Sequence, residues 1–154
     1  QFNLAGKKYR MRLFSYFESE GDQDREVKAV LLEDEIFNRL RLDPAQFQDE
    51  QVVELIPAAH YLRLHHQAAV PRQARIRHQQ QESGTWLIVE YLHLPRTLRI
   101  RYETEFPYRV LEWQEDDEGQ LTRAVLKRTL RLPYWEHHDN DDLPLRDSLQ
   151  LLCF

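Results

Sequence analysis

Residues 97–103 read Thr97-Leu98-Arg99-Ile100-Arg101-Tyr102-Glu103, and their alternation is the strongest fold signal in the chain. Leucine, isoleucine and tyrosine occupy every second position, with arginines and a glutamate between them. A period of two is typical of a β-strand, whose successive side chains point to opposite faces of a sheet. The pattern predicts an antiparallel sheet with one face on a core and one face in water.

Strand-like segments of similar length flank this stretch on both sides. Turn-forming residues separate them, among them Glu82-Ser83-Gly84 and Asp116-Asp117-Glu118-Gly119. Short connections join antiparallel neighbours, so we expect a five-stranded meander. The expected strands are Ala74–Gln81, Thr85–Tyr91, Thr97–Glu103, Tyr108–Glu115 and Leu121–Leu132.

The first half of the chain predicts a helix that covers the sheet. Leu32, Ile36 and Leu40 recur at helical spacing, which predicts a helix over Leu32–Arg41. It ends before Asp43-Pro44, because proline disfavours the helical conformation in the residue ahead of it.

Shorter elements complete the expected fold. Alternating aromatic residues predict a strand over residues 7–19, and a short apolar run predicts another over 51–56. Residues 58–72 combine strand-like and helix-like features and stay open between the two. Near the C-terminus, Asp141 or Asp142 as the cap and Pro144 in the first turn predict a short helix.

These elements together predict a β-rich α+β fold. We expect a curved antiparallel sheet around a core, one covering helix and a short C-terminal helix. The chain of 154 residues has 42% hydrophobic residues and no internal repeat or linker, so we expect a single domain over residues 1–154.

Charge, cysteine content and hydropathy limit the classes of partner. The net charge of −5 gives no overall attraction to nucleic acid, and no apolar run is long enough to span a bilayer. The single cysteine, Cys153, excludes a disulfide within the chain. Gln1 is not a start methionine, so we expect a mature product or the C-terminal part of a longer protein.

Acids spaced by two lie at Glu18, Glu20, Asp22 and Asp24. On one extended face they would offer a hard cation several oxygen ligands. Gly21 interrupts that face, and we favour the alternative in which the acids solvate a turn and precede the following helix.

A second acidic cluster also contains histidines: His137, His138, Asp139 and Asp141. Imidazole and carboxylate groups bind transition metals, so a metal site is one hypothesis for this loop. Neighbouring histidines on an extended chain point in opposite directions, which favours a solvated capping loop.

Two further sets of side chains are candidates for binding a ligand. Arg63, Arg72, Arg75 and Arg77 lie in a stretch without acids and could bind an anion, or could pair with Glu90, Glu103 and Glu112 on the wet face of the sheet. Trp86, Trp113 and Trp135 could line an apolar ligand cavity, or could belong to the core.

The sequence contains no nucleophile motif and no glycine-rich phosphate loop. We therefore favour a protein without enzymatic activity, leave an enzyme open as the alternative, and expect no cofactor.

Several short pieces of the chain, in order, resemble one protein family. They include Ser15-Tyr16-Phe17-Glu18-Ser19-Glu20-Gly21-Asp22-Gln23, Leu40-Arg41-Leu42-Asp43-Pro44, Tyr61-Leu62-Arg63-Leu64, Phe106-Pro107-Tyr108 and Tyr134-Trp135. The family consists of secreted or lipid-anchored bacterial envelope proteins of unknown activity that often carry the label "septum formation inhibitor". Its members are longer at the N-terminus, so the resemblance implies the C-terminal portion of such a protein.

The resemblance implies a location in the periplasm or the outer cell envelope. It implies no reaction, since the nucleotide pyrophosphatases with the same label carry a serine- and arginine-rich signature that this sequence lacks.

Three functional hypotheses follow from the sequence. The first is a non-enzymatic envelope protein that binds a protein partner or a hydrophobic or polymeric ligand on the sheet face. The alternatives are a metal-assisted hydrolase that uses the loop from His137 to Asp142, and an anion-binding module.

Overall fold

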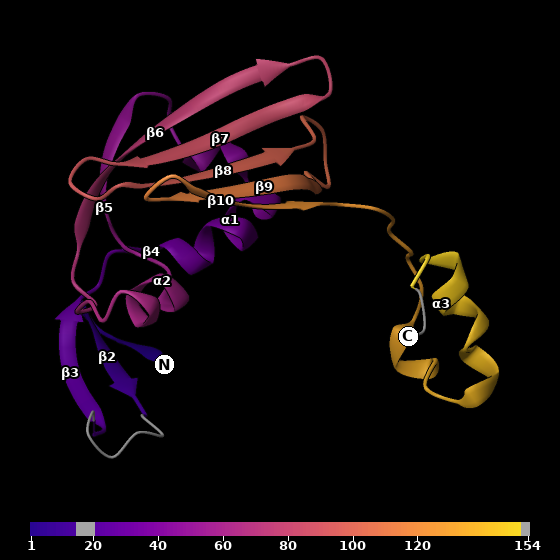
Figure 1. Cartoon of the computed structure of the whole chain (residues 1–154), viewed down its shortest axis with the longest axis horizontal. Coiled ribbons are helices and arrows are strands. Elements are labelled where there is room, and N and C mark those ends of the chain that lie inside the picture. The colour runs from indigo at the N-terminus through magenta and orange to yellow at the C-terminus, as the bar shows by residue number, and fades with distance from the viewer. Residues whose placement is uncertain (15–20, 152–154) are drawn as a thin grey trace.

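The computed structural model of the chain describes residues 1–14 and 21–151, and these residues form two sheets (Figure 1). The larger sheet has the strand order β10-β9-β8-β7-β6-β5-β4, and the smaller one has the order β1-β2-β3. Neighbouring strands are antiparallel except β4 and β5, which are parallel. The strands are β1 (Phe2–Ala5), β2 (Lys8–Leu13), β3 (Gln23–Lys28), β4 (Leu31–Leu32), β5 (Gln51–Ile56), β6 (Arg72–Gln81), β7 (Gly84–Tyr91), β8 (Arg96–Tyr102), β9 (Val110–Asp117) and β10 (Gln120–Val125).

The predicted α+β fold with its meander is confirmed, since β6 to β10 follow one another in the sheet. In β8, Leu98, Ile100 and Tyr102 are buried, while Arg99 and Arg101 on the other face are partly exposed. We call the face with Leu98, Ile100 and Tyr102 the groove face, after a cavity described below, and the face with Arg99 and Arg101 the arginine face. The core lies on the groove face, because directly paired residues of neighbouring strands share a face: Leu87 of β7 and Trp113 of β9 both pair with Ile100.

The covering helix is also present, but its predicted start at Leu32 is wrong, because Leu32 belongs to β4. A 3-10 turn, η1 (Glu33–Glu35), leads into α1 (Ile36–Leu42), and a second turn, η2 (Pro44–Gln46), follows. Ile36 and Leu40 of α1 are fully buried in the main core cluster, as the helical spacing predicts. The helix ends before Asp43, whose carboxylate accepts a hydrogen bond from the N–H group of Ala45 and so caps the next turn.

The segment left open between strand and helix contains a short helix, α2 (Ala59–Leu64). Its residues Tyr61 and Leu62 are buried in a second core cluster, which also contains Tyr9 and Ile56. This cluster lies between α2, the smaller sheet and β5. The helix therefore stands at the point where the two sheets meet.

The predicted turn before the covering helix is wrong, because β3 occupies residues 23–28. The expected strand over residues 7–19 is β2 up to Leu13, and Glu18 and Glu20 lie outside the described residues. Asp24 lies within β3, where its carboxylate accepts hydrogen bonds from Arg10 and Arg12 of β2. Cross-strand charge pairs stabilise this hairpin in place of an apolar pattern.

The last strand of the meander is shorter than the sequence predicts. β10 ends at Val125, and the N–H group of Leu126 donates one more hydrogen bond to the carbonyl of Leu111. The strand β9 begins at Val110, the residue opposite Lys127 in this register, so residues 128–132 extend beyond the residues with which they could pair. This extended segment carries the chain away from the sheets (Figure 1).

A terminal lobe, residues 134–151, stands at the end of that segment. It contains η3 (Tyr134–Glu136), η4 (Asn140–Asp142) and the predicted C-terminal helix α3 (Pro144–Ser148). The expected cap is wrong in position: Leu143 precedes α3, and the Asp142 carboxylate accepts a hydrogen bond from the N–H group of Asp139 in the turn before. Pro144 does stand in the first turn. In the described part of the chain, no helix is long and apolar enough to cross a membrane.

Candidate ligand groove

A cavity of about 640 Å³ lies between the helices and the groove face of β8, β9 and β10. Helix α1 contributes Phe37, and α2 contributes His60, Tyr61 and Leu64. The sheet places Trp113, Glu115 and Asp117 of β9 on this face, because they pair with Ile100, Leu98 and Arg96 of β8. We call this cavity the groove; its lining also includes Glu33, Asp34, Ala58, Arg96, Gln120 and Thr122.

A buried ion pair forms the floor of the groove. The side chains of Arg96 and Glu33 are 1% and 2% exposed, and Arg96 Nη2 lies 2.5 Å from Glu33 Oε1. Glu33 Oε2 accepts further hydrogen bonds from Arg96 Nε at 3.2 Å, from the Tyr91 hydroxyl at 2.6 Å and from the N–H group of Ala58 at 3.3 Å. Both carboxylate oxygens are therefore satisfied, as a buried charge requires.

The environment of this pair affects its neighbours. Burial alone would lower the pKa of the Arg96 guanidinium, but its hydrogen bond to Glu33 and the charges of Glu33 and Glu115 raise it. Burial, and then the charge of Glu33, raise the pKa of the Tyr91 hydroxyl. The Tyr61 ring lies 4.6 Å from the guanidinium carbon of Arg96, at cation–π distance. Arg96 is therefore held as a cation and Tyr91 as a neutral hydrogen-bond donor.

Two histidine–carboxylate pairs connect α2 and its C-terminal end to β9. His60 Nε2 lies 3.0 Å from Glu115 Oε2, and His65 Nε2 lies 2.7 Å from Asp117 Oδ2. Glu115 Oε2 is also 3.6 Å from Arg96 Nη2, so it belongs to the charged floor. These pairs fix one wall of the groove against its base.

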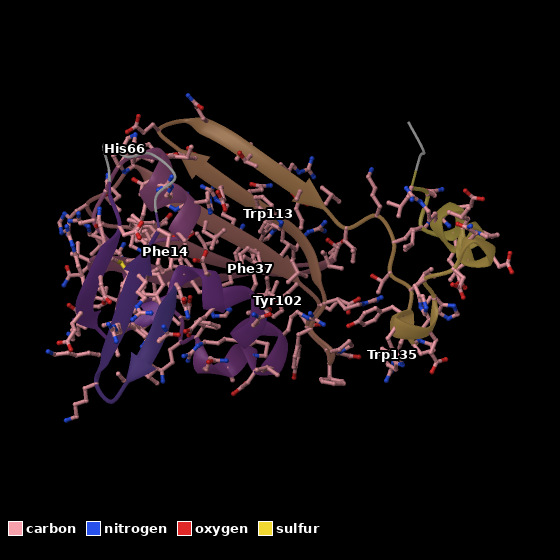
Figure 2. The ribbon with its side chains drawn as sticks, turned by 90° about the horizontal axis from the view of Figure 1, so that it is seen from below. Phe14, Phe37, His66, Tyr102, Trp113 and Trp135 are labelled. Atoms are coloured by element: carbon pink, nitrogen blue, oxygen red, sulfur yellow. The ribbon has the colours of Figure 1, made fainter. Side chains whose placement is uncertain are left out.

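The remaining wall is apolar. The rings of Phe37 and Trp113 meet edge to face with their centroids 6.4 Å apart, and Figure 2 shows the two residues close to each other. Leu64 on α2 is 71% exposed and lines the same cavity. A ligand in the groove would thus contact aromatic and aliphatic surface beside charged groups, as is usual for binding sites.

The groove carries a surplus of negative charge. Its carboxylates, from Glu33, Asp34, Glu115 and Asp117, outnumber its single guanidinium, from Arg96. One oxygen, Oδ1 of Asp117, is buried and accepts no hydrogen bond from the described residues. Such an arrangement favours a ligand that brings a cationic hydrogen-bond donor.

The structure does not bring the three predicted tryptophans together. Trp113 lines the groove, whereas Trp86 lies on the arginine face, where its ring is 5.8 Å from the Arg101 guanidinium and its N–H group donates to Gln81. Trp135 is 66% exposed and belongs to the terminal lobe (Figure 2).

The predicted arginines also fall into separate places. Arg63 lines a second cavity, of about 530 Å³, between α2, the residues after it and the smaller sheet. Arg75 and Arg77 belong to β6, where Arg75 Nε is 3.9 Å from Glu50 and Arg77 donates to Glu90. Arg72 opens the same strand.

The expected pairing of these arginines with glutamate on the wet face is present in part. Arg77 reaches Glu90 on the neighbouring strand, whereas Glu112 and Glu103 pair with Arg101 and Arg109, which were not among the candidates. Glu112 is buried and also accepts hydrogen bonds from Arg123 and Gln114. The hydrogen bond from Arg123 is the main reason that the pKa of Glu112 is lowered to about 2, against the effect of burial, which would raise it.

The acidic loop near the C-terminus pairs internally. His137 Nδ1 lies 2.8 Å from Asp142 Oδ1, which lowers the pKa of that carboxylate, and Asp142 was not among the proposed ligands His137, His138, Asp139 and Asp141. Among residues 1–14 and 21–151, no three His, Cys, Asp or Glu side chains are grouped so that they could hold a metal ion.

Most residues of the groove floor were not among the sequence candidates. The period of two places Arg96 on the same face as Leu98 and Ile100, and Glu115 pairs with Leu98. A charged residue at a position that faces the core was therefore the sequence signal for these two residues. Glu33 gave no such signal, because its partners come from segments distant in the sequence.

Comparisons of the chain with protein-family models, with curated protein sequences and with solved structures each find no match.

Proposed function

We propose that this chain is a binding protein without enzymatic activity, whose groove takes a basic, apolar segment of a partner protein. One observation carries the proposal: the groove combines the apolar surface of Phe37, Trp113 and Leu64 with a surplus of carboxylates. An extended peptide that alternates apolar and basic side chains matches both features. A location in the bacterial cell envelope, which the sequence resemblance implies, is part of the same proposal.

The buried charges support a binding role because they are committed to structure. Arg96 and Glu33 satisfy each other, His60 of the groove is paired with Glu115, and His65 is paired with Asp117 of the groove. General acid–base catalysis needs a group free to exchange a proton with the substrate. The groups of the groove instead present fixed charges, which select a ligand and orient it.

The proposal predicts a charge preference that peptides can test. We expect a labelled seven-residue peptide of alternating leucine and arginine to bind, and the matching leucine–glutamate peptide not to bind, in fluorescence anisotropy at low salt. Asp117→Asn should weaken binding by about threefold to tenfold, because it removes one carboxylate from the groove.

Asp116→Asn is the matched control. Asp116 is the neighbouring residue, on the other face of β9, and it accepts a hydrogen bond from the N–H group of Gly119 that an asparagine oxygen can also accept. Melting curves of both variants would confirm that they fold. Equal binding of the acidic and basic peptides, or equal effects of the two substitutions, would overturn the proposal.

A further inference from the structure

One edge of the larger sheet is open along β10. Within the described residues this strand pairs with β9 on one side only, and its residues are exposed except Ala124, which is partly exposed. The N–H group of Leu126 points toward β9, where it donates to Leu111. Since successive backbone groups of a strand point to opposite sides, those of Leu121, Arg123 and Val125 face the open edge.

The segment after β10, residues 126–133, continues the pattern of that strand without a partner strand in the described part of the chain. We call it the basic arm. Leu126 and Leu130 are 41% and 40% exposed, and they share the parity of Thr122, which faces the groove. By the same parity, Lys127 and Thr129 would belong to the arginine face, and Arg128 to the face of the leucines. Arg128 donates a hydrogen bond to the carbonyl of Ser148 in the terminal lobe. Apart from Arg128, the segment has the side-chain pattern of a half-buried strand.

The sequence of this edge carries one of the usual protections of an edge strand, which is charge, but lacks proline. The charged side chains are Arg123, Lys127, Arg128 and Arg131. Residues 120–132 contain no proline and no glycine. The arm of the same chain cannot fold back to cover the edge of β10, because a tight return needs turn-forming residues that residues 126–132 lack.

We propose that residues 120–132 of two copies of this chain pair as antiparallel strands about a two-fold axis at Leu126. With the axis at Leu126, every residue from 120 to 132 stands opposite a residue of the other copy. Residues with even numbers then face residues with even numbers, so the groove faces of both sheets lie on the same side. It places Arg123 opposite Thr129 of the other copy, and Leu121 opposite Arg131. The backbone groups of all four face the partner strand, as hydrogen-bonded pairs require.

Charge complementarity supports a second copy as the occupant. The arm carries Lys127, Arg128 and Arg131, and no acid occurs from Leu121 to Leu132. In the proposed pair, this arm would lie near the end of β9 in the other copy, which carries the acidic run Glu115-Asp116-Asp117-Glu118. Leu121 pairs with Asp116 of β9, so Arg131 of the other copy would lie one strand away from Asp116, on the same face. This attraction favours the register and offsets the repulsion between the cations of the two arms.

The pairing would also change the groove. Leu130 of the second copy would stand opposite Thr122, which lines the groove and pairs with Glu115. The arm leucines would therefore close the open side of the groove beside Trp113. This inference does not depend on the ligand of the groove, since it rests on the open edge and the arm alone.

The test is the mass of the full chain in solution, measured by sedimentation equilibrium from about 1 μM to 100 μM, the range in which weak dimers dissociate. We expect twice the mass of one chain at the upper end. Thr129→Pro should raise the dissociation constant by about tenfold or more, because it removes an N–H group that faces the partner. Thr129→Val, which keeps the N–H group and a β-branched side chain, should dimerise at least as well as the natural chain.

Hydrogen exchange gives a second readout of the same interface. In the dimer, slow exchange should extend to the amides that face the open edge, and in Thr129→Pro these amides should exchange fast while the core strands stay protected. These amides belong to Leu121, Arg123, Val125, Lys127, Thr129 and Arg131. A chain that is monomeric at every concentration, or a dimer that Thr129→Pro leaves intact, would overturn the proposal.

Discussion

At the scale of single residues, charge inside this protein is tolerated where the polar atoms of a side chain have partners. Glu33 is the clearest case, because its two oxygens accept hydrogen bonds from Arg96, from Tyr91 and from the backbone of Ala58. These donors come from β8, from β7 and from the residue before α2. One carboxylate therefore joins the covering helices to the sheet.

We predict that Glu33→Gln lowers the free energy of unfolding by about 3–5 kcal/mol, because the substitution leaves Arg96 buried without a counter-charge. Urea denaturation measures this loss. Glu35→Gln, two residues away, removes a partly exposed ion pair with Arg39 and leaves an amide oxygen that can still accept the hydrogen bond from Tyr9; it should cost only about 0.3–0.5 kcal/mol. Similar losses for the two variants would mean that Arg96 finds another partner.

Glu112 on the arginine face gives a prediction that depends on pH. Its pKa is lowered to about 2 from an ordinary value of 4.5, chiefly by the hydrogen bond from Arg123. The folded state thus favours the ionised carboxylate, which stabilises the protein above about pH 4.5; this contribution is lost as the pH falls through about 2.

Glu112→Gln should therefore cost about 1–3 kcal/mol at neutral pH and progressively less as the pH falls below about 4.5. Denaturation curves of both proteins across this pH range measure the difference. The control is Glu54→Gln, which removes a carboxylate from an exposed pair with Lys28. A cost for Glu112→Gln that is constant down to about pH 2 would contradict the assignment.

At the scale of elements, the hairpin between β6 and β7 depends on a glycine. Gly84 has a φ of +129°, and a Cβ atom placed there would lie 2.5 Å from the carbonyl oxygen of Tyr102 on β8. The hairpin and the next strand therefore approach each other more closely than any other residue allows.

Gly84→Ala should destabilise the protein more than Gly119→Ala, with a difference of about 1–3 kcal/mol. Gly119 also has a positive φ, of +85°, but a Cβ atom placed there would meet no described atom within 4 Å. The comparison separates backbone strain, which both variants share, from the clash with Tyr102. Melting temperatures of the two variants measure it, and equal values would show that β8 moves to make room.

Element by element, prediction from the sequence succeeded where apolar periodicity was present. The meander and the covering helix have it, and both are in the structure. β3 was missed because Gln23-Asp24-Arg25-Glu26-Val27-Lys28 contains one apolar residue and pairs through charges, as Arg10 does with Asp24. β10 was predicted too long because the pattern continues to Leu132, whereas the strand ends where β9 offers no further partner.

At the scale of the whole molecule, the groove could be predicted only in part. Trp113 was a candidate because large aromatic side chains often line binding sites as well as cores. The floor was not, because it assembles residues from β8, β9, η1 and α2, whose proximity depends on how the helices fold back over the sheet. Such long-range juxtapositions leave no local pattern in a single sequence.

The other edge of the larger sheet is formed by β4, which consists only of Leu31 and Leu32 and continues directly into η1. A two-residue edge that turns into a helix gives an incoming chain almost no backbone to pair with. Strand addition at β4 is therefore disfavoured. The two-fold pairing that we propose through β10 would use that edge of both copies at once, so it would end at a closed pair.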